Sequence, residues 1–138
     1  VLMGNHYHML LVTPKGNLDV FIYEFNKRLA LKIKKQTGQS GRIFGGRYKW
    51  CLIESQKYLS NCYRYIYQNP MRAGIVQLCE DYEFSTLQCI LGKFSLGVPL
   101  HDRYGFKDEY TLRWINEAIK DDDLRLLKKK LYRSICRN

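Results

Sequence analysis

The sequence has no long hydrophobic run and no closely paired cysteines. Its longest uncharged apolar stretch, around residues 9–12, is far too short to cross a bilayer, and no charged leader with a cleavage site precedes it. The five cysteines are odd in number and include no Cys-x-x-Cys pair, which argues against a disulfide framework and against a zinc site. We therefore expect a cytoplasmic protein with reduced thiols and no membrane partner.

Nucleotide-binding loops are also missing. The glycines between residues 38 and 46 do not fit the Gly-x-x-x-x-Gly-Lys-Ser/Thr pattern. Gly45-Gly46 precedes a predicted strand, whereas the glycines of a dinucleotide fingerprint would open a helix. At 138 residues, with 46% apolar content, the chain is nevertheless long enough to fold around a hydrophobic core.

Acidic residues are scarce in the first half of the chain. Residues 1–76 carry 12 lysines and arginines against three acids, a balance of +9, whereas residues 77–138 carry 11 against 10. The total net charge of +10 therefore belongs almost wholly to the first part. Such a basic region attracts polyanions, of which nucleic acid is the commonest, although solubility alone also accounts for a basic surface.

Histidine is rare as well, and two of the three histidines form the tripeptide His6-Tyr7-His8. In an extended strand, side chains two residues apart project from one side, about 6.6 Å apart along the backbone. Two imidazoles at this spacing can converge on one divalent metal ion. The alternative interpretation is the polar face of a half-buried sheet.

Two segments have the composition of β-strands. Gly4-Asn5 suits the turn of a hairpin, because both residues tolerate positive φ, and the strand that follows would run from residue 6 to about 12. Another strand is predicted over residues 47–53, which are rich in aromatic and apolar side chains. Basic and aromatic residues alternate between 42 and 50, which fits either stacking on bases with phosphate contact or a plain amphipathic strand.

Helical spacing of apolar residues occurs in four segments. Asn17 can cap a helix whose apolar residues recur as far as Ile33. A second helix is predicted over residues 55–69, and Pro70 ends it. Two further helices are predicted, over residues 112–119 and 124–131. The acidic triplet between them is interpreted as a helix cap, because acids at a helix start favour its dipole.

The helix over residues 55–69 places a phenol and a carboxamide on one stripe. Tyr65 and Asn69 are four residues apart and therefore face the same way. Tyr67 lies about 200° around the helix from Tyr65, so only one of these two shares the face of Asn69. Packing of a half-buried helix is the other explanation for the tyrosine enrichment.

Four short motifs follow one another along residues 1–90. They are His-Tyr-His at 6–8, Gly-Gly-Arg-Tyr-Lys at 45–49, Tyr-Ile-Tyr-Gln-Asn-Pro-Met-Arg-Ala-Gly-Ile-Val at 65–76, and Asp-Tyr-Glu-Phe-Ser at 81–85. This ordered set resembles the motifs of HUH single-tyrosine transposases. Within that family the chain most resembles the REP-associated tyrosine transposases, which are related to the transposases of small insertion sequences.

The resemblance implies an α+β fold, with a central antiparallel sheet, helices packed on it and the ferredoxin-like topology of HUH endonucleases. Residues 1–90 would form the catalytic domain. We expect this domain to be N-terminally incomplete, because the family's first strand, its helix and most of a second strand have no counterpart here. Residues 91–138 would form a C-terminal helical extension.

The resemblance also implies a chemistry. His6 and His8 would hold Mg²⁺ or Mn²⁺, with Asn69 as the third metal ligand. Tyr65 would attack the scissile phosphate of single-stranded, hairpin-bearing DNA and form a 5′-phosphotyrosine intermediate. Tyr67 and Tyr63 are the competing nucleophiles, and we choose Tyr65 because of its i to i+4 relation with Asn69.

DNA is the partner that this interpretation requires. The predicted DNA-contact residues are Lys27, Arg28, Arg42, Arg47, Lys49 and Arg72. The family includes monomers and dimers, which leaves a homodimer open, and its chemistry would place the protein at the bacterial nucleoid. The alternative is a domesticated or truncated DNA- or RNA-binding module that is catalytically silent. A third interpretation is a basic globular fragment with incidental histidines.

Overall fold

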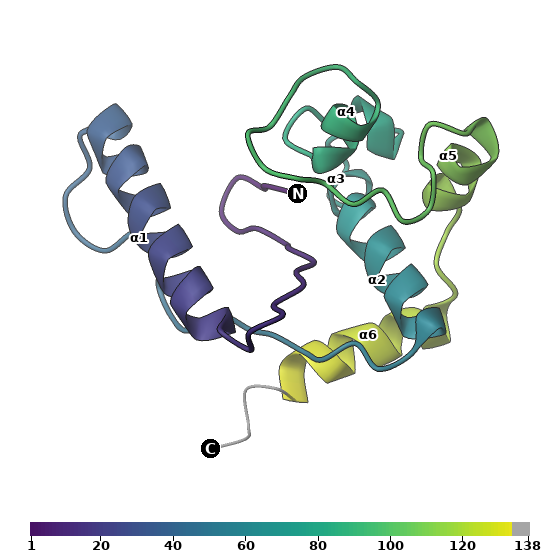
Figure 1. The fold of residues 1–138 in the computed structure, drawn as a ribbon, viewed down its shortest axis with the longest axis horizontal. Coiled ribbons are helices and arrows are strands. Elements are labelled where there is room, and N and C mark those ends of the chain that lie inside the picture. Colours follow the sequence, from purple (N-terminus) through teal and green to yellow (C-terminus); the bar gives the residue numbers. More distant parts are fainter. Residues whose placement is uncertain (134–138) are drawn as a thin grey trace.

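The computed structural model describes residues 1–133, and its regular structure there is helical. The elements, in chain order, are α1 (Leu18–Thr37), α2 (Gln56–Tyr67), α3 (Asn69–Arg72), the 3-10 turn η1 (Cys79–Asp81), α4 (Thr86–Ile90), α5 (Glu109–Asn116) and α6 (Asp121–Arg133). Figure 1 shows α1 on one side, the other helices grouped around α2, and the N-terminal segment running between the two parts. None of the helices in this described part is long and apolar enough to cross a membrane.

The predicted central antiparallel sheet is not formed, so the predicted ferredoxin-like α+β fold is wrong for this structure. Over residues 1–133 the only β pairing is one isolated antiparallel bridge, between Leu2 and Tyr7. The segment 47–53 has the composition of a strand, but it leaves Trp50 and Leu52 exposed. A strand persists only where its N–H and C=O groups pair with a neighbour, and composition does not supply that neighbour.

The hairpin turn at Gly4-Asn5 is confirmed, but the predicted strand from residue 6 to about 12 is not formed, because only Tyr7 makes a β bridge there. The Met3 amide donates to the His6 carbonyl at 2.8 Å, and the His8 amide donates to the Val1 carbonyl at 3.0 Å. Neither turn residue adopts the positive φ that was expected of it. The turn therefore closes on backbone hydrogen bonds and needs no left-handed conformation.

The N-terminal hairpin is also bonded to a distant segment. The Leu2 amide donates to the Phe84 carbonyl at 2.9 Å. The Tyr82 hydroxyl donates to the Leu2 carbonyl at 2.6 Å. Both backbone groups of Leu2 are thus satisfied by residues just before α4, which fixes the position of the His6-Tyr7-His8 tripeptide relative to the helices.

The first predicted helix is confirmed as α1, and it begins directly after Asn17. The Asn17 side chain makes no capping hydrogen bond, so its position was correct and its expected interaction was not. The helix ends at Gly38, whose φ of 69° is left-handed and whose amide donates to the Lys34 carbonyl. Within α1 only Ile22 is buried.

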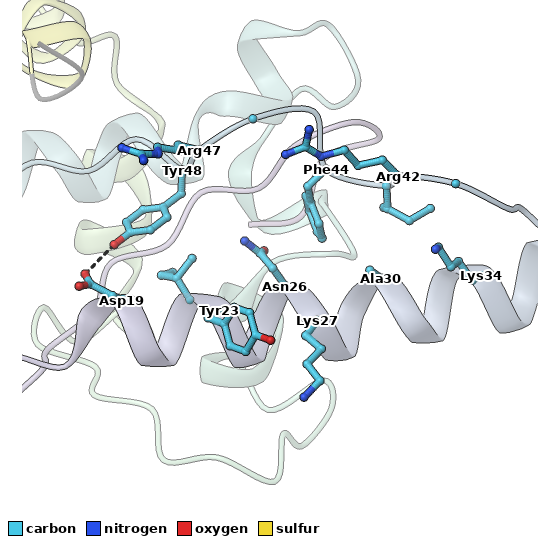
Figure 2. Close-up of a pocket in the computed structure, with 14 residues that line it drawn as sticks. Asp19, Tyr23, Asn26, Lys27, Ala30, Lys34, Arg42, Phe44, Arg47 and Tyr48 are labelled. Carbon is cyan, nitrogen blue, oxygen red and sulfur yellow. Dashed lines mark hydrogen bonds between the residues drawn. The ribbon is translucent and has the colours of Figure 1, made fainter.

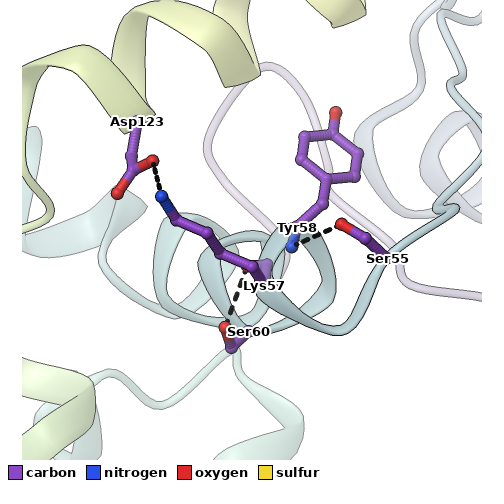
Figure 3. Close-up of polar contacts among 5 residues, drawn as sticks. All are labelled: Ser55, Lys57, Tyr58, Ser60 and Asp123. Carbon is purple, nitrogen blue, oxygen red and sulfur yellow. Dashed lines mark hydrogen bonds and ion pairs between the residues drawn. The ribbon is translucent and has the colours of Figure 1, made fainter.

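The second predicted helix is confirmed as α2, with an earlier end. The Ser55 hydroxyl caps its start by accepting from the Tyr58 amide at 3.2 Å, as Figure 3 shows. The helix stops at Tyr67, and α3 follows at once with Pro70 in its first turn. Proline has no amide hydrogen to donate, which suits the start of a helix and explains why the chain begins a new helix at this point.

Two hydrophobic clusters form the core, and α2 contributes to both. The first cluster consists of Tyr67, Cys79, Leu87, Phe106 and Ile115. The second consists of Tyr58, Cys62, Ile119 and Leu127. Side chains from before and after residue 90 therefore share both clusters.

The two predicted C-terminal helices are confirmed as α5 and α6. Asp121, Asp122 and Asp123 occupy the first turn of α6, where their charge favours the helix dipole. Asp123 also pairs with Lys57 of α2 at 3.1 Å, shown in Figure 3. Because the Lys57 side chain is largely exposed, this pair contributes less to stability than the packing of α6 on α2.

The thiols of the described residues agree with the expectation of reduced cysteines. Cys51, Cys62, Cys79 and Cys89 are all free. Cys62 and Cys79 are buried, and burial raises the pKa of each thiol to about 12. These two thiols are therefore protonated core residues at neutral pH. Cys136 lies outside the described residues.

Candidate metal and tyrosine site

The structure brings together the four residues predicted for the metal and the nucleophile. The His6 and His8 rings lie 5.1 Å apart between centroids, edge to face. The His8 ring meets the Tyr65 ring at 5.5 Å, also edge to face. The Asn69 side chain lies beside the His8 ring and favours its protonated form. The N-terminal hairpin and the junction of α2 with α3 thus meet at one cluster, which we call the His-Tyr cluster (His6, His8, Tyr65 and Asn69).

The α2–α3 junction fixes the second half of this cluster. The Asn69 amide nitrogen donates to the Tyr65 carbonyl at 2.6 Å, so its amide oxygen is the atom left for His8. Gln68, between them, is 4% exposed and donates to the Ile115 carbonyl at 2.7 Å. The junction is therefore bonded both within itself and to the end of α5.

Electrostatics keep His8 neutral. Burial, the nearby His6 and the N-terminus together lower the pKa of His8 to about 4, against the opposing effect of the Asn69 side chain. At neutral pH the imidazole therefore carries no charge and keeps one nitrogen lone pair. A neutral imidazole is the form that binds a metal ion.

His6 is exposed, and its ring is oriented by its own turn. Its Nδ1 lies 2.6 Å from the Asn5 side-chain oxygen, which can only accept. Nδ1 therefore carries the proton, and Nε2 is left with the lone pair. A ring nitrogen held by a neighbouring acceptor is the usual way in which a metal-binding histidine is oriented.

The donor set of the cluster fits a divalent cation. Two imidazoles and one carboxamide oxygen provide three neutral ligands, a set that suits Mn²⁺ and leaves positions for phosphate oxygens and water. Over residues 1–133 no three His, Cys, Asp or Glu side chains form a cluster, so any metal at this point would need the Asn69 oxygen as its third protein ligand.

Tyr67 lies in the core, and Tyr63 is partly buried and packs against it. Tyr67 is 6% exposed, its hydroxyl pairs with the Thr86 hydroxyl at 3.1 Å, and burial raises its pKa to about 12. Tyr63 packs edge to face on Tyr104 at 4.8 Å, and burial raises its pKa too. Both rings pack near Phe106, whereas Tyr65 packs against His8.

The six predicted DNA-contact residues come from three parts of the chain. Arg72 is at the cluster itself, with its guanidinium 5.7 Å from the centroid of the Tyr65 ring. Lys27 and Arg28 lie on α1, where both approach Glu24, at 3.7 and 3.8 Å. The remaining three follow α1 in an irregular segment and are exposed: Arg42, Arg47 and Lys49.

Three residues of this region had no predicted role. Tyr7 donates from its hydroxyl to the Asn26 side-chain oxygen at 2.7 Å, and so joins the histidine tripeptide to α1. The alternation of side chains along an extended segment could have indicated that Tyr7 faces away from both histidines. No sequence signal indicated that Gln68 bonds to α5, because that partner is set by tertiary packing.

Comparison with known protein families, with curated proteins and with solved structures found no match to this chain. Membership of the HUH transposase family therefore stays a prediction from the four motifs.

Proposed function

We propose that the chain is a metal-dependent single-stranded DNA endonuclease and strand transferase, a transposase-type enzyme in which Tyr65 is the nucleophile. One observation carries the proposal: the Tyr65 ring packs against the His8 ring, and the Asn69 side chain also lies beside His8. A phenol next to a possible metal site is the arrangement that phosphoryl transfer to tyrosine requires. The DNA would carry hairpins, and the protein would act at the bacterial nucleoid.

The ligands of the proposed site are ready at neutral pH. His6 presents Nε2, because Nδ1 is committed to Asn5, and His8 is uncharged because burial lowers its pKa to about 4. Mg²⁺ or Mn²⁺ bound by His6, His8 and Asn69 would polarise the scissile phosphate and stabilise charge on its oxygens. Imidazole ligands favour Mn²⁺ over the harder Mg²⁺.

The proposed reaction exchanges one phosphate ester for another. The Tyr65 oxygen forms a bond to phosphorus, the bond from phosphorus to the 3′ oxygen breaks, and that oxygen leaves as a hydroxyl after taking a proton. The tyrosine proton is lost in the same step. Because the ester energy is kept in the phosphotyrosine, a 3′ hydroxyl can later reverse the reaction without ATP. Arg72, beside the Tyr65 ring, places positive charge near the phosphate.

A catalytically silent DNA- or RNA-binding module is the second candidate. It is favoured by the backbone that holds the histidines, which has one isolated bridge where a sheet was expected. Catalytic groups need to be held within about 0.5 Å of their productive positions, which a supporting sheet would provide. The two candidates share the basic surface and differ in whether a covalent bond to DNA forms.

The decisive experiment looks for that covalent bond. The protein is incubated with hairpin-bearing single-stranded DNA and Mn²⁺ or Mg²⁺, and the products are separated under denaturing conditions. A 5′-phosphotyrosine retains the 3′ part of the strand, so a 3′ label should migrate with the protein and a 5′ label should be released. Tyr65→Phe should abolish the adduct, and Tyr67→Phe is the matched control that should retain it. An adduct that survives Tyr65→Phe would refute the assignment, and no adduct with either metal would favour the binding module.

A further inference from the structure

A groove lies between α1 and the irregular segment 41–48. Its volume is about 460 Å³, and Figure 2 shows the side chains that line it, which come from both elements. Ile22, Ala30 and Ile43 make part of its lining apolar. This groove is distinct from the His-Tyr cluster, none of whose residues lines it.

The charge around the groove is strongly positive. Four cationic residues line it, two from each side: Lys27, Lys34, Arg42 and Arg47. The one carboxylate in the lining belongs to Asp19, and it accepts from the Tyr48 hydroxyl at 2.9 Å. Lys27 also lies 3.7 Å from Glu24, which offsets part of its charge. The other three positive charges, against one occupied carboxylate, make the lining complementary to phosphates.

Aromatic rings accompany these charges. Tyr23 lines the groove from α1 and is 64% exposed, while Phe44 and Tyr48 line it from the opposite segment. A duplex would offer the groove only its phosphates, because its bases are stacked on one another. An unpaired strand offers flat bases as well, and base stacking on aromatic side chains combined with phosphate contacts is how single strands are bound.

Tyr7 connects the groove with the His-Tyr cluster. Its hydroxyl donates to Asn26, which lines the groove, and its ring meets that of Phe44 at 6.3 Å. His6 and His8 flank Tyr7 in sequence. Their rings contact each other, and the His8 ring contacts Tyr65. The groove and the cluster therefore lie against the same tripeptide.

We infer that this groove binds an unpaired segment of the DNA strand, with bases on its aromatic residues and phosphates on its cations, next to the position where Tyr65 would act. The inference rests on the proposed function for naming DNA as the polymer. It adds a second contact region, separate from the reacting atoms, that would select single strands over duplex.

Binding is tested with the whole chain in EDTA, so that no cleavage contributes. A fluorescent single strand of about 12 nucleotides, its duplex and the RNA of the same sequence are titrated by anisotropy over about 50–200 mM salt. The double variant Arg42→Gln/Arg47→Gln removes two groove charges. The matched control, Lys32→Gln/Lys35→Gln, removes two exposed charges of α1 that do not line the groove.

We expect the single strand to bind more tightly than the duplex and the RNA. The groove double variant should lower the slope of log affinity against log salt by about 1.4, since each lost phosphate contact removes about 0.7. Tyr23→Ala should weaken binding at least about fivefold, whereas Tyr110→Ala, on exposed α5 surface, should leave affinity unchanged. Circular dichroism checks that each variant keeps its helices.

Several results would overturn the inference. The inference would be refuted if the groove variants bound the single strand as tightly as their control variants do. It would also be refuted if the duplex bound as tightly as the single strand, or if RNA bound more tightly. A wild-type dimer that Tyr23→Ala converts to a monomer would assign the groove to a second copy of the chain. If the groove fails this test while the Tyr65 adduct still forms, the proposed nicking activity stands. If the groove binds the single strand as expected but no adduct forms, only the proposed nicking activity is refuted.

Discussion

Substitution of Gln68 tests whether its hydrogen bonds to the end of α5 stabilise the α2–α3 junction. Its amide nitrogen donates to the Ile115 carbonyl at 2.7 Å and to the Glu117 carbonyl at 2.6 Å, at the end of α5. The last carbonyls of a helix have no partner within the helix, so these bonds satisfy groups that would otherwise be orphaned. Gln68→Leu keeps a similar volume and removes both donors.

Losing the Gln68 donor should cost more free energy at one carbonyl than at the other. The Glu117 carbonyl keeps a second donor, the guanidinium of Arg64, so losing Gln68 there costs about 0.5–1.5 kcal/mol. The Ile115 carbonyl keeps only a long contact of 3.8 Å from the Cys79 thiol, and leaving a buried acceptor unsatisfied costs about 1–3 kcal/mol. We therefore expect Gln68→Leu to lower the free energy of unfolding by about 2–4 kcal/mol.

Urea unfolding followed by circular dichroism measures this change. The midpoint should fall by about 1–2 M, with little change in the slope of the transition. Gln77→Leu is the matched control, because Gln77 is exposed and the same substitution there should change stability by less than about 0.5 kcal/mol.

Gln68→Glu adds a pH dependence with a defined sign. Burial and the two facing carbonyls would raise the pKa of the new carboxyl in the folded state above its unfolded value of about 4.3. The protonated acid can still donate one bond, so relative to wild type the variant should be most stable below pH ~4 and should lose stability as pH rises through its folded pKa. The account of Gln68 is refuted if Gln68→Leu matches Gln77→Leu, or if Gln68→Glu gains stability relative to wild type as pH rises.

Three further outcomes follow from the core, a helix cap and the His-Tyr cluster. Leu87→Ala should lower the free energy of unfolding by about 2–5 kcal/mol in urea, because Leu87 is 0% exposed; a loss no larger than that of the exposed Leu96→Ala would contradict this. Ser85→Ala should cost about 1 kcal/mol in the same assay by removing the cap bond to the Leu87 amide, and Ser85→Asp should restore it. Burial lowers the folded pKa of His8 to about 4 from an ordinary 6.5, so the unfolded state binds the proton first and wild-type stability should fall as pH drops from about 6.5 to 4. His8→Gln should flatten that part of the pH profile of the urea midpoint, and an unchanged profile would show that His8 is not the titrating group.

The helices could be predicted because their information is local. Apolar residues recurring as far as Ile33 defined α1, and the spacing around Cys62 defined α2, since the hydrogen bonds of a helix join residues four apart. The break after α2 was also readable from Pro70, although its continuation as α3 was not. The proline pattern says where a helix cannot continue and leaves open whether another begins.

The sheet could not be predicted from the same kind of pattern. Residues 47–53 have strand composition, but a strand requires a partner elsewhere in the chain, and composition carries no information about that partner. The Gly4-Asn5 turn was predictable because both of its arms are adjacent in sequence. The four family motifs predicted the sheet as part of a whole fold, which the structure of residues 1–133 does not contain.

For the candidate site too, local features could be predicted from the sequence and long-range contacts could not. The common face of Tyr65 and Asn69 follows from helix geometry alone. The approach of His8 to Tyr65 was expected only through the family resemblance, because the two lie on segments far apart in sequence. The groove was not predicted, since neither α1 nor the segment 41–48 indicates that the other lies opposite.

The position of α2 between two core clusters also bears on which substitutions the chain can tolerate. One side of α2 packs Tyr67 into the first cluster, another packs Tyr58 and Cys62 into the second, and a third presents Tyr65 to His8. In contrast, α1 buries only Ile22 along its length. A saturation screen should therefore find α2 nearly intolerant over successive turns and α1 permissive at most positions, so that sequence drift would accumulate in the longer helix first.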